Sequence, residues 1–234
     1  MSQNVLVVHG GGPTAVINAS LYGVIEEAKR NPEVGKVYGA IGGTGAIFSE
    51  TFIDLTSFDD EKLKLLLHTP ASAIGSSRYP LYEKDYEKMV DIFKKHDIKY
   101  VLLNGGNGTM DACGHIYEVC KDQDIKVVGI PKTIDNDIAM TDHSPGYGSA
   151  ARFIAASTQE VGEDVKSLPI HVCIMEAMGR NAGWITAASA LARRKQGDAP
   201  HLIYLPERNF NEDEFLEDVS RLQKKQGGVV VLDK

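Results

Sequence analysis

The sequence has few cysteines and no spacing that would use them. Its 234 residues include only Cys113, Cys120 and Cys173, an odd number without a CxxC pair. Disulfide frameworks and structural zinc sites normally need cysteines at regular spacing. The cysteines therefore argue against a small disulfide-stabilised domain and favour a reducing compartment.

Long apolar runs and an excess of positive charge are missing as well. No window approaches eighteen unbroken apolar residues, and the chain runs from Met1 into a strand-like segment without a secretory pattern. The 25 Lys and Arg residues are outnumbered by 32 Asp and Glu residues, for a net charge of -7. Nucleic acid and anionic membranes lack their usual electrostatic attraction to such a chain. We expect a cytoplasmic protein that binds neither, in which a polyanionic substrate requires a local basic pocket.

The sequence does have short β-branched runs that alternate with longer amphipathic stretches. Its apolar share of 43% is enough for one large core or two smaller ones. The runs suit strands buried on both faces, and the stretches repeat apolar residues every three or four positions. Expected strands cover residues 4–8, 99–103, 126–130, 170–175, 201–205 and 228–232, with another near Val37, and the clearest helices cover 82–96 and 212–225. This order predicts an α/β fold, a doubly wound and mostly parallel sheet with helices on both faces.

Four loops that follow these strands hold the candidate functional residues, because ligands of open parallel sheets collect beyond the carboxyl ends of the strands. The loops cover residues 9–14, 104–109, 131–137 and 176–181. In the first, Gly10-Gly11-Gly12 enters a helix, an arrangement that brings backbone N–H groups close to a phosphate but also makes a tight turn without a ligand. The lysine of a Walker motif and the acidic residue of a dinucleotide fold are absent.

The second loop, Gly105-Gly106-Asn107-Gly108-Thr109, repeats the glycine-rich pattern at another strand end. Two such loops at one edge predict a phosphate-binding crevice. Asn107 is either a metal- or phosphate-contacting residue or a turn residue that tolerates left-handed backbone. Gly108 has no side chain and leaves space beside the phosphates.

The third loop carries two carboxylates. Asp135 and Asp137 are two positions apart, and in an extended segment they point to the same side, as a general base and a metal-binding partner do. Lys132 supplies a cation and Thr133 a hydroxyl for a transferring phosphoryl group. The alternative is a solvated acidic turn in which the carboxylates cap the local backbone.

Two arginines and one histidine complete the candidates. Arg180, after Met178 and Gly179, and Arg78 have the planar fork that grips a phosphate or sugar hydroxyls, although each alone is more often a surface residue. His9 is interpreted as a hydrogen-bonded structural histidine.

Together these motifs resemble those of the phosphofructokinases. The resemblance runs from about residue 4 to the end of the chain and rests on Gly10-Gly11-Gly12-Pro13, Gly105-Gly106-Asn107-Gly108-Thr109, Pro131-Lys132-Thr133-Ile134-Asp135-Asn136-Asp137 and Met178-Gly179-Arg180. It implies phosphoryl transfer from ATP or pyrophosphate to the 1-hydroxyl of fructose 6-phosphate, a step of glycolysis, with Mg²⁺ as cofactor.

The resemblance also implies a role for each site residue. Asp135 would be the general base, and Lys132 and Arg180 would be catalytic with it. The implied donor-binding residues are Gly11, Gly12, Arg78, Gly108 and Thr109. The implied substrate-binding residues are Thr133, Asp137, His171, Met178, Gly179 and Arg180. Asn107 and Asp137 would contact the metal.

Two positions leave the donor open. In pyrophosphate-dependent members an Asp typically fills the place of Gly108, where it repels the α-phosphate of ATP, and a Lys fills the place of Lys132. This chain has the lysine without the aspartate. The space at Gly108 favours ATP slightly, and pyrophosphate remains the alternative.

Two positions depart from the family pattern. Asn107 stands where many ATP-using members carry an Asp associated with magnesium, so coordination there is expected to rely on water and Asp137. His171 stands where many members place an arginine that reaches the sugar phosphate of a neighbouring subunit. Sugar-phosphate affinity is therefore expected to differ.

Family members continue well beyond the length of this chain. We expect residues 1–137 to form the donor-binding lobe and residues 138–234 to form part of the fructose 6-phosphate lobe. The chain is interpreted as a fragment that binds the sugar phosphate poorly alone and that is a homo-oligomer when full length. Two other interpretations are an enzyme like the diacylglycerol and NAD kinases and a catalytically silent nucleotide- or phosphate-binding module.

Replacement of Asp135 by Ala separates a kinase from a silent module. In a kinase, loss of the general base lowers phosphorylation of fructose 6-phosphate by roughly 10²-fold to 10⁴-fold while donor binding is retained. Initial rates and donor affinity of the two proteins are the measurements. Equal rates would contradict the assignment of Asp135 as the base.

Overall fold

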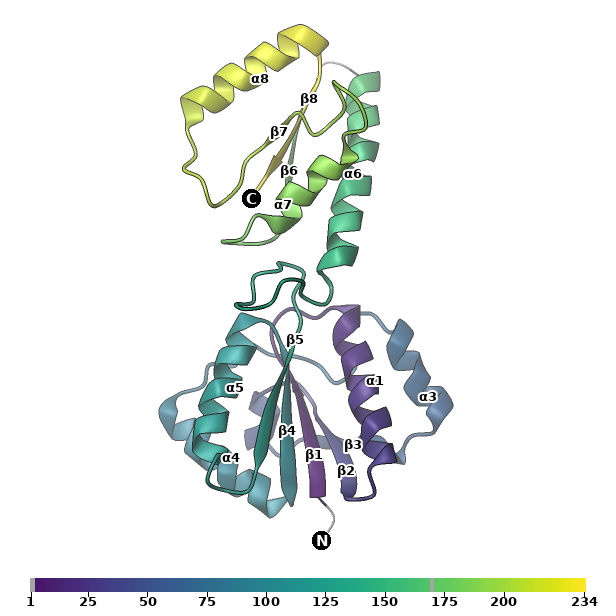
Figure 1. Ribbon diagram of the computed structural model, residues 1–234, viewed down its shortest axis with the longest axis vertical. Helices are drawn as coiled ribbons and strands as arrows, with labels where there is room; N and C mark the ends of the chain where they lie inside the picture. Colours follow the sequence, from purple (N-terminus) through teal and green to yellow (C-terminus); the bar gives the residue numbers. More distant parts are fainter. Residues whose placement is uncertain (1–2, 169–170) are drawn as a thin grey trace. The chain divides into compact units, whose positions relative to one another are not determined.

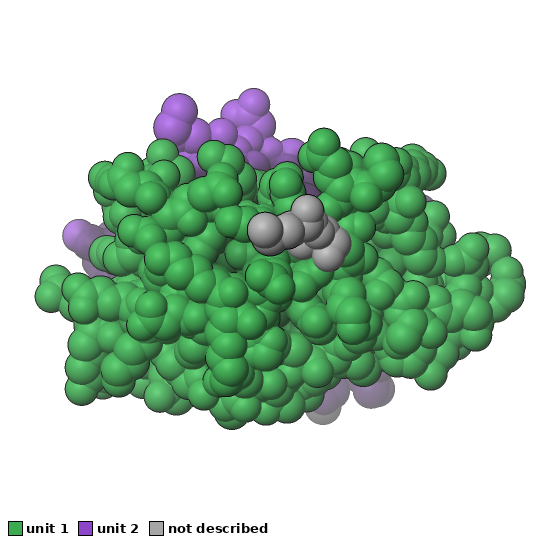
Figure 2. Space-filling view, turned by 90° about the horizontal axis from the view of Figure 1, so that it is seen from below, with its two compact units in different colours: residues 1–132 green, residues 133–234 purple. Residues whose placement is uncertain are grey.

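The computed structural model describes residues 3–168 and 171–234. The chain divides into two compact units, residues 1–132 and residues 133–234, which Figure 2 draws in green and purple. The boundary expected from the sequence, after Asp137, falls a few residues later. Each unit has its own sheet, and each is described by itself.

The first unit is built on a five-stranded sheet with the strand order β3-β2-β1-β4-β5 (Figure 1). Its strands are β1 Gln3–His9, β2 Val34–Ala40, β3 Phe52–Asp54, β4 Ile98–Gly105 and β5 Lys126–Pro131. Four of them run parallel, and β3 pairs antiparallel with β2. The sequence did not predict β3, because three residues are too few to show an alternating pattern.

Helices cover both faces of this sheet (Figure 1). They are α1 Ala15–Arg30, α2 Gly45–Phe48, α3 Asp60–Lys64, α4 Glu83–Lys95 and α5 Asn107–Cys120, with 3₁₀ turns at Leu55–Ser57 and Leu65–His68. In β1, Leu6 and Val8 pack against α4 and α5, whereas Val5 and Val7 pack against α1 and α3. Because successive side chains of a strand point to opposite faces, one apolar run supplies both cores. The prediction of a doubly wound α/β fold is confirmed.

The second unit has a parallel three-stranded sheet with the order β6-β8-β7. Its elements are α6 Tyr147–Ser167, β6 Val172–Glu176, α7 Trp184–Ala188, a 3₁₀ turn at Ser189–Ala192, β7 Leu202–Ile203, α8 Glu212–Gln226 and β8 Val229–Asp233. The central strand β8 is buried from Val229 to Leu232, and α6 and α7 pack on one face of the sheet. Asn211 caps the start of α8, and its side chain accepts hydrogen bonds from the N–H groups of Asp213 and Glu214.

The expected strands match this sheet with two differences. Ile170, in the expected strand at 170–175, lies outside the described residues, and β6 begins at Val172. The expected strand at 201–205 is paired as a strand only at Leu202–Ile203, although His201 and Tyr204 still donate backbone hydrogen bonds to β8. Within the described ranges, no helix is long and apolar enough to cross a membrane.

Candidate functional site

The side chain of Thr109 packs against the backbone at the carboxyl ends of β1 and β4. A Cβ placed on Gly10 would lie 2.3 Å from Thr109 Oγ1, and one placed on Gly105 would lie 2.2 Å from the same atom. The Gly10 N–H also donates to the Asn104 carbonyl at 2.9 Å. Both glycines are therefore required by the close approach of Thr109, and the two glycine loops lie together as predicted.

A serine-rich segment holds the first glycine loop in place. Gly11 has a φ of +76°, which glycine adopts without strain. Its N–H donates to the Ser77 carbonyl at 3.1 Å, and its carbonyl accepts from the Ser76 hydroxyl at 2.7 Å. Thr44 N–H in turn donates to Ser77 Oγ at 3.2 Å. The N–H and the carbonyl of Gly11 are thus both hydrogen-bonded to the serine segment.

Lys132 brings a buried positive charge to this edge of the sheet. Its side chain is 4% exposed, and a Cβ on Gly11 would lie 3.7 Å from its Nζ. Its backbone N–H donates to Gly105 at 2.9 Å and so continues the pairing of β5 with β4. A lysine beside a glycine loop is a group that can contact a phosphate oxygen.

His9 is the neutral neighbour of that charge. The Ser72 hydroxyl donates to the Gly75 carbonyl and accepts at 2.8 Å from His9 Nδ1, which therefore carries the hydrogen. Burial, and then the positive charge of Lys132, lowers the pKa of His9 from 6.5 to about 4. Nε2 has no hydrogen-bond partner among the described atoms, so the interpretation of His9 as hydrogen-bonded holds for Nδ1 alone, and its structural role stays a prediction.

An open pocket of about 310 Å³ lies beside these loops in the first unit. Its lining residues are Gly11, Pro13, Ala71, Ser72, Gly75, Ser76, Ser77 and Arg78. Arg78 is exposed at its rim. Of the predicted donor-binding residues, the structure therefore places Gly11 and Arg78 in one cavity, and Gly12 is exposed next to it.

Asn107 and Gly108 are the first two residues of α5. Asn107 is helical, so the alternative of a left-handed turn residue is wrong. Both residues are exposed, and a Cβ on Gly108 would meet no described atom within 4 Å. The space expected at Gly108 is present, and the N–H groups of the helix start add partial positive charge to this edge.

The segment with the two carboxylates is a turn, which corrects the expectation of an extended segment and agrees with the shape of the alternative, an acidic turn. Asn136 has a φ of +56°, and the Asp135 N–H donates to Thr133 Oγ1 at 3.1 Å. The buried Asn136 side chain accepts from the Ser144 N–H at 2.7 Å and fixes the turn to the segment that precedes α6. Side-chain alternation therefore does not apply here. Asp135 is half-buried and Asp137 is exposed.

The loop of Met178, Gly179 and Arg180 follows β6. The Ala177 N–H donates to Asp233 at 2.8 Å, so the sheet pairing continues to the start of the loop. Arg180 is exposed and has a φ of +43°, an unusual conformation for a residue with a side chain. The loop presents a cation at the carboxyl edge of the second sheet.

His171 does not lie with these residues. It precedes β6, whereas Met178 and Arg180 follow it, so the strand of about 17 Å separates them. A larger cavity of about 550 Å³ in the second unit, lined by α6 and the segment around Asp198, contains none of the predicted site residues. The prediction that Asp135 meets Gly11 and Gly108 in one cleft spans the two units and stays a prediction.

The predicted metal ligands supply oxygen atoms only. In residues 3–168 and 171–234, no group of three or more His, Cys, Asp or Glu side chains is arranged to hold a metal ion. Mg²⁺ usually takes one or two protein ligands and completes its shell with water and phosphate oxygens. The amide of Asn107 and the carboxylate of Asp137 fit that chemistry.

Sequence reasoning missed Ser72, Ser76 and Ser77, which shape the pocket, and Glu207, which contacts the loop after β6. Glu207 follows β7, so the rule that loops after parallel strands carry function would have found it. The serines follow no strand, and only the neighbouring Arg78 pointed to them.

The comparisons with known proteins agree with one another. The sequence profile described as "Phosphofructokinase" matches residues 4–234. The pyrophosphate–fructose 6-phosphate 1-phosphotransferase of Rhodospirillum rubrum is 43% identical over 97% of this chain and 56% of its own length, and that of Halomonas elongata is 40% identical over 98% and 58%. The solved pyrophosphate-dependent phosphofructokinase of Marinobacter aquaeolei has a TM-score of 0.90 at 40% identity, over 99% of this chain and 60% of that one. The chain thus spans somewhat more than half the length of these relatives.

Replacement of Gly105 by Ala tests the packing of Thr109. The added Cβ collides with Thr109 and with the Gly10 carbonyl oxygen, 2.7 Å away, and we expect a loss of about 3 kcal/mol in the free energy of unfolding. Urea denaturation followed by circular dichroism measures it. Gly114→Ala in the exposed middle of α5 is the control and should stabilise by about 1 kcal/mol. Equal stability of the two variants would show that the close approach is absent.

The lowered pKa of His9 predicts how stability depends on pH. The unfolded chain takes up the proton near pH 6.5 and the folded chain only near pH 4. Stability is therefore complete above pH 6.5 and falls by about 3 kcal/mol as the pH drops to 4. In the control variant His9→Asn this part of the loss should disappear from denaturation curves measured between pH 7 and 4. If the free energy of unfolding changed with pH equally in the wild type and in His9→Asn, a neutral buried His9 would be contradicted.

Proposed function

The chain belongs to the phosphofructokinase family, and we propose that it transfers a phosphoryl group from pyrophosphate to the 1-hydroxyl of fructose 6-phosphate. The products would be fructose 1,6-bisphosphate and inorganic phosphate. The observation that carries the proposal is the buried ammonium of Lys132 beside Gly11, at the edge where β1, β4 and β5 end. Membership of this family sets aside the interpretation as a diacylglycerol or NAD kinase.

Pyrophosphate is preferred here over ATP, which the sequence argument slightly favoured. The names of the relatives at 40% and 43% identity specify pyrophosphate. The open space at Gly108 permits a nucleotide but does not attract one, whereas Lys132 neutralises the charge of a phosphate directly. Of the donor-side residues, Gly11, Gly12 and the N–H groups at the start of α5 would contact phosphate oxygens, with Arg78 at the rim and Thr109 holding the loops.

Asp135 would take the proton from the sugar 1-hydroxyl as its oxygen attacks the phosphorus. The turn that presents this carboxylate is held by Thr133, and Thr133 is buried. Asp135 is three residues from Lys132, so covalent geometry limits their Cα separation to about 11 Å. This short reach supports a base and a charge-stabilising cation that act on the same reacting group.

The sugar phosphate would be held by residues of the second unit. Met178 and Gly179 would contact the sugar, and Arg180 would brace the charge that develops during transfer. Asp137 would orient the sugar, and Asn107 and Asp137 are the residues that would hold Mg²⁺. The metal, when bound, neutralises phosphate charge. The contact of His171 with a neighbouring subunit, homo-oligomer assembly and a cytoplasmic location remain predictions.

Assays with both donors test the proposal. With fructose 6-phosphate as acceptor, we expect the 234-residue chain to turn over pyrophosphate faster than ATP. Gly108→Asp should retain turnover with pyrophosphate and lower any turnover with ATP at least tenfold, since the new carboxylate occupies the space that the α-phosphate needs. Initial rates with each donor are the measurement.

Gly114→Asp, the same change in the exposed middle of α5, is the matched control and should alter neither rate. Faster turnover with ATP than with pyrophosphate in the wild-type chain would overturn the choice of donor. ATP turnover that Gly108→Asp leaves unchanged would remove the steric argument.

A further inference from the structure

The loop that carries Arg180 is held in an unusual backbone conformation. Arg180 has a φ of +43° and Gly179 a φ of +141°. A Cβ on Gly179 would lie 2.2 Å from the Ala182 carbonyl oxygen, and the Ala182 N–H donates to the Gly179 carbonyl at 2.7 Å. Backbone of this kind persists where neighbouring contacts hold it in place. The direction of the Arg180 side chain therefore depends on what fixes the ends of this loop.

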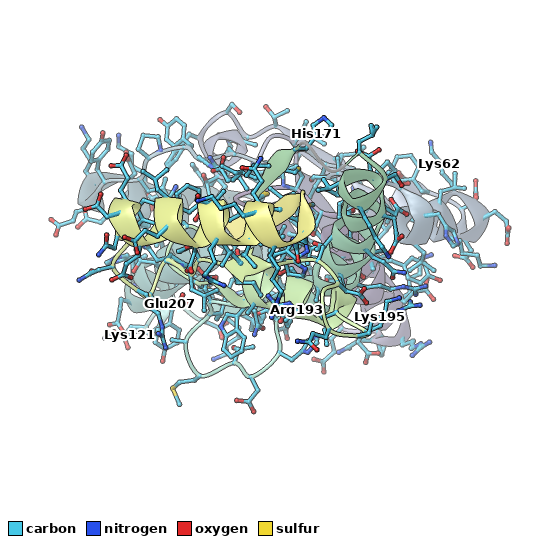
Figure 3. The ribbon with its side chains drawn as sticks, turned by 90° about the horizontal axis from the view of Figure 1, so that it is seen from above. Lys62, Lys121, His171, Arg193, Lys195 and Glu207 are labelled. Carbon is cyan, nitrogen blue, oxygen red and sulfur yellow. The ribbon has the colours of Figure 1, made fainter. Side chains whose placement is uncertain are left out.

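One end continues β6, and the other is held by Glu207. Glu207 Oε1 accepts a hydrogen bond from the Gly183 N–H at 2.7 Å. β6 and β7 both run parallel to β8, so the loop after β6 and the segment after β7 leave the sheet at the same end, where the strands have their carboxyl termini. Figure 3 labels Glu207 in the segment that leads from β7 to α8. The loop is thus fixed by the sheet before it and by a carboxylate after it.

The packing at Gly183 shows how closely this segment approaches. A Cβ on Gly183 would lie 2.7 Å from Glu207 Oε2, 2.9 Å from Leu205 Cδ2 and 3.0 Å from Pro206 Cδ. Its φ is -83°, which any residue adopts. The backbone of Gly183 would permit a side chain, but a Cβ there would displace the ends of the Glu207 and Leu205 side chains.

We propose that Glu207 is a positioning residue for the sugar-phosphate site. Its carboxylate accepts a hydrogen bond from the Gly183 N–H and fixes the backbone from Gly179 to Gly183. This backbone in turn orients the Arg180 side chain toward the site for fructose 6-phosphate. Glu207 acts through the loop and does not touch the sugar. The inference rests on the proposed function, which assigns Arg180 to fructose 6-phosphate.

The role requires an acceptor oxygen and not a negative charge. Glutamine retains that oxygen, and alanine removes it. A weaker second contact, from the Tyr147 hydroxyl to the Trp184 carbonyl at 3.3 Å, also restrains the start of α7. We therefore expect loss of the Glu207 contact to loosen the loop without unfolding the second unit.

Two measurements on the 234-residue chain test the proposal. Amide hydrogen exchange at Gly183 reports the loop, and nuclear magnetic resonance titration with fructose 6-phosphate reports binding even when it is weak. In Glu207→Ala, we expect exchange at Gly183 to become about tenfold faster or more and the dissociation constant for the sugar phosphate to rise about tenfold. Glu207→Gln should stay within about threefold of the wild type in both.

A second variant disturbs the hydrogen bond between Glu207 and the Gly183 N–H by changing Gly183. Gly183→Ala pushes the segment of Leu205 and Glu207 away while Glu207 remains, and it should weaken sugar-phosphate binding as Glu207→Ala does. Glu217→Ala removes one negative charge from the exposed surface of α8 and is the matched control, with no change in either measurement. Thermal unfolding identifies any variant that fails to fold.

Each result bears on the proposal. Unchanged exchange at Gly183 in Glu207→Ala would overturn it, as would unchanged binding of fructose 6-phosphate. Glu207→Gln as defective as Glu207→Ala would also overturn it, because the charge itself would then be needed. A wild-type chain that binds no sugar phosphate would contradict the proposed function. If the variants of that chain still showed the expected exchange rates at Gly183, the contact of Glu207 with the loop would nevertheless be supported.

Discussion

A single buried ammonium, that of Lys132, governs the electrostatics of the edge at which β1, β4 and β5 end. Burying a cation is costly unless the surroundings compensate it. Here, His9 stays neutral beside Lys132, a Cβ on Gly11 would lie 3.7 Å from Nζ, and the segment of Ser76 and Ser77 fixes the Gly11 backbone. These features place the cation, a neutral histidine and a fixed glycine loop at one edge of the first unit.

The second unit meets a different constraint, which is to present side chains from strained backbone. Asn136 and Arg180 both have positive φ values; Asn136 lies between the carboxylates of Asp135 and Asp137, and Arg180 is itself the cation that the proposed chemistry uses. Strain of this kind is held by specific contacts, from Ser144 at the first turn and from Glu207 at the second loop. Charge is buried in one unit, and geometry is enforced in the other.

Much of the fold could be predicted from the sequence, because apolar runs such as 4–8 and 99–103 supply both faces of a sheet and so stand out as continuous apolar segments. The glycine loops were readable for a similar reason, since each follows a run. The turn at Asp135 was predicted only as the alternative to an extended segment. Its shape comes from the hydrogen bond of Asn136 to Ser144, a contact between residues that no short-range pattern links. Glu207 could have been found from its place after β7, whereas its hydrogen bond with Gly183, 24 residues away, could not.

The wedge formed by Thr109 constrains how this edge can change over evolutionary time. Its hydroxyl occupies the space that side chains on Gly10 and Gly105 would need, so these three positions share one volume. A side chain at position 10 has room only if the residue at position 109 becomes smaller in the same lineage. Position 105 has no such route, because its Cβ would still lie 2.7 Å from the backbone carbonyl oxygen of Gly10. Replacements at positions 10 and 109 should therefore be correlated, whereas position 105 should remain glycine.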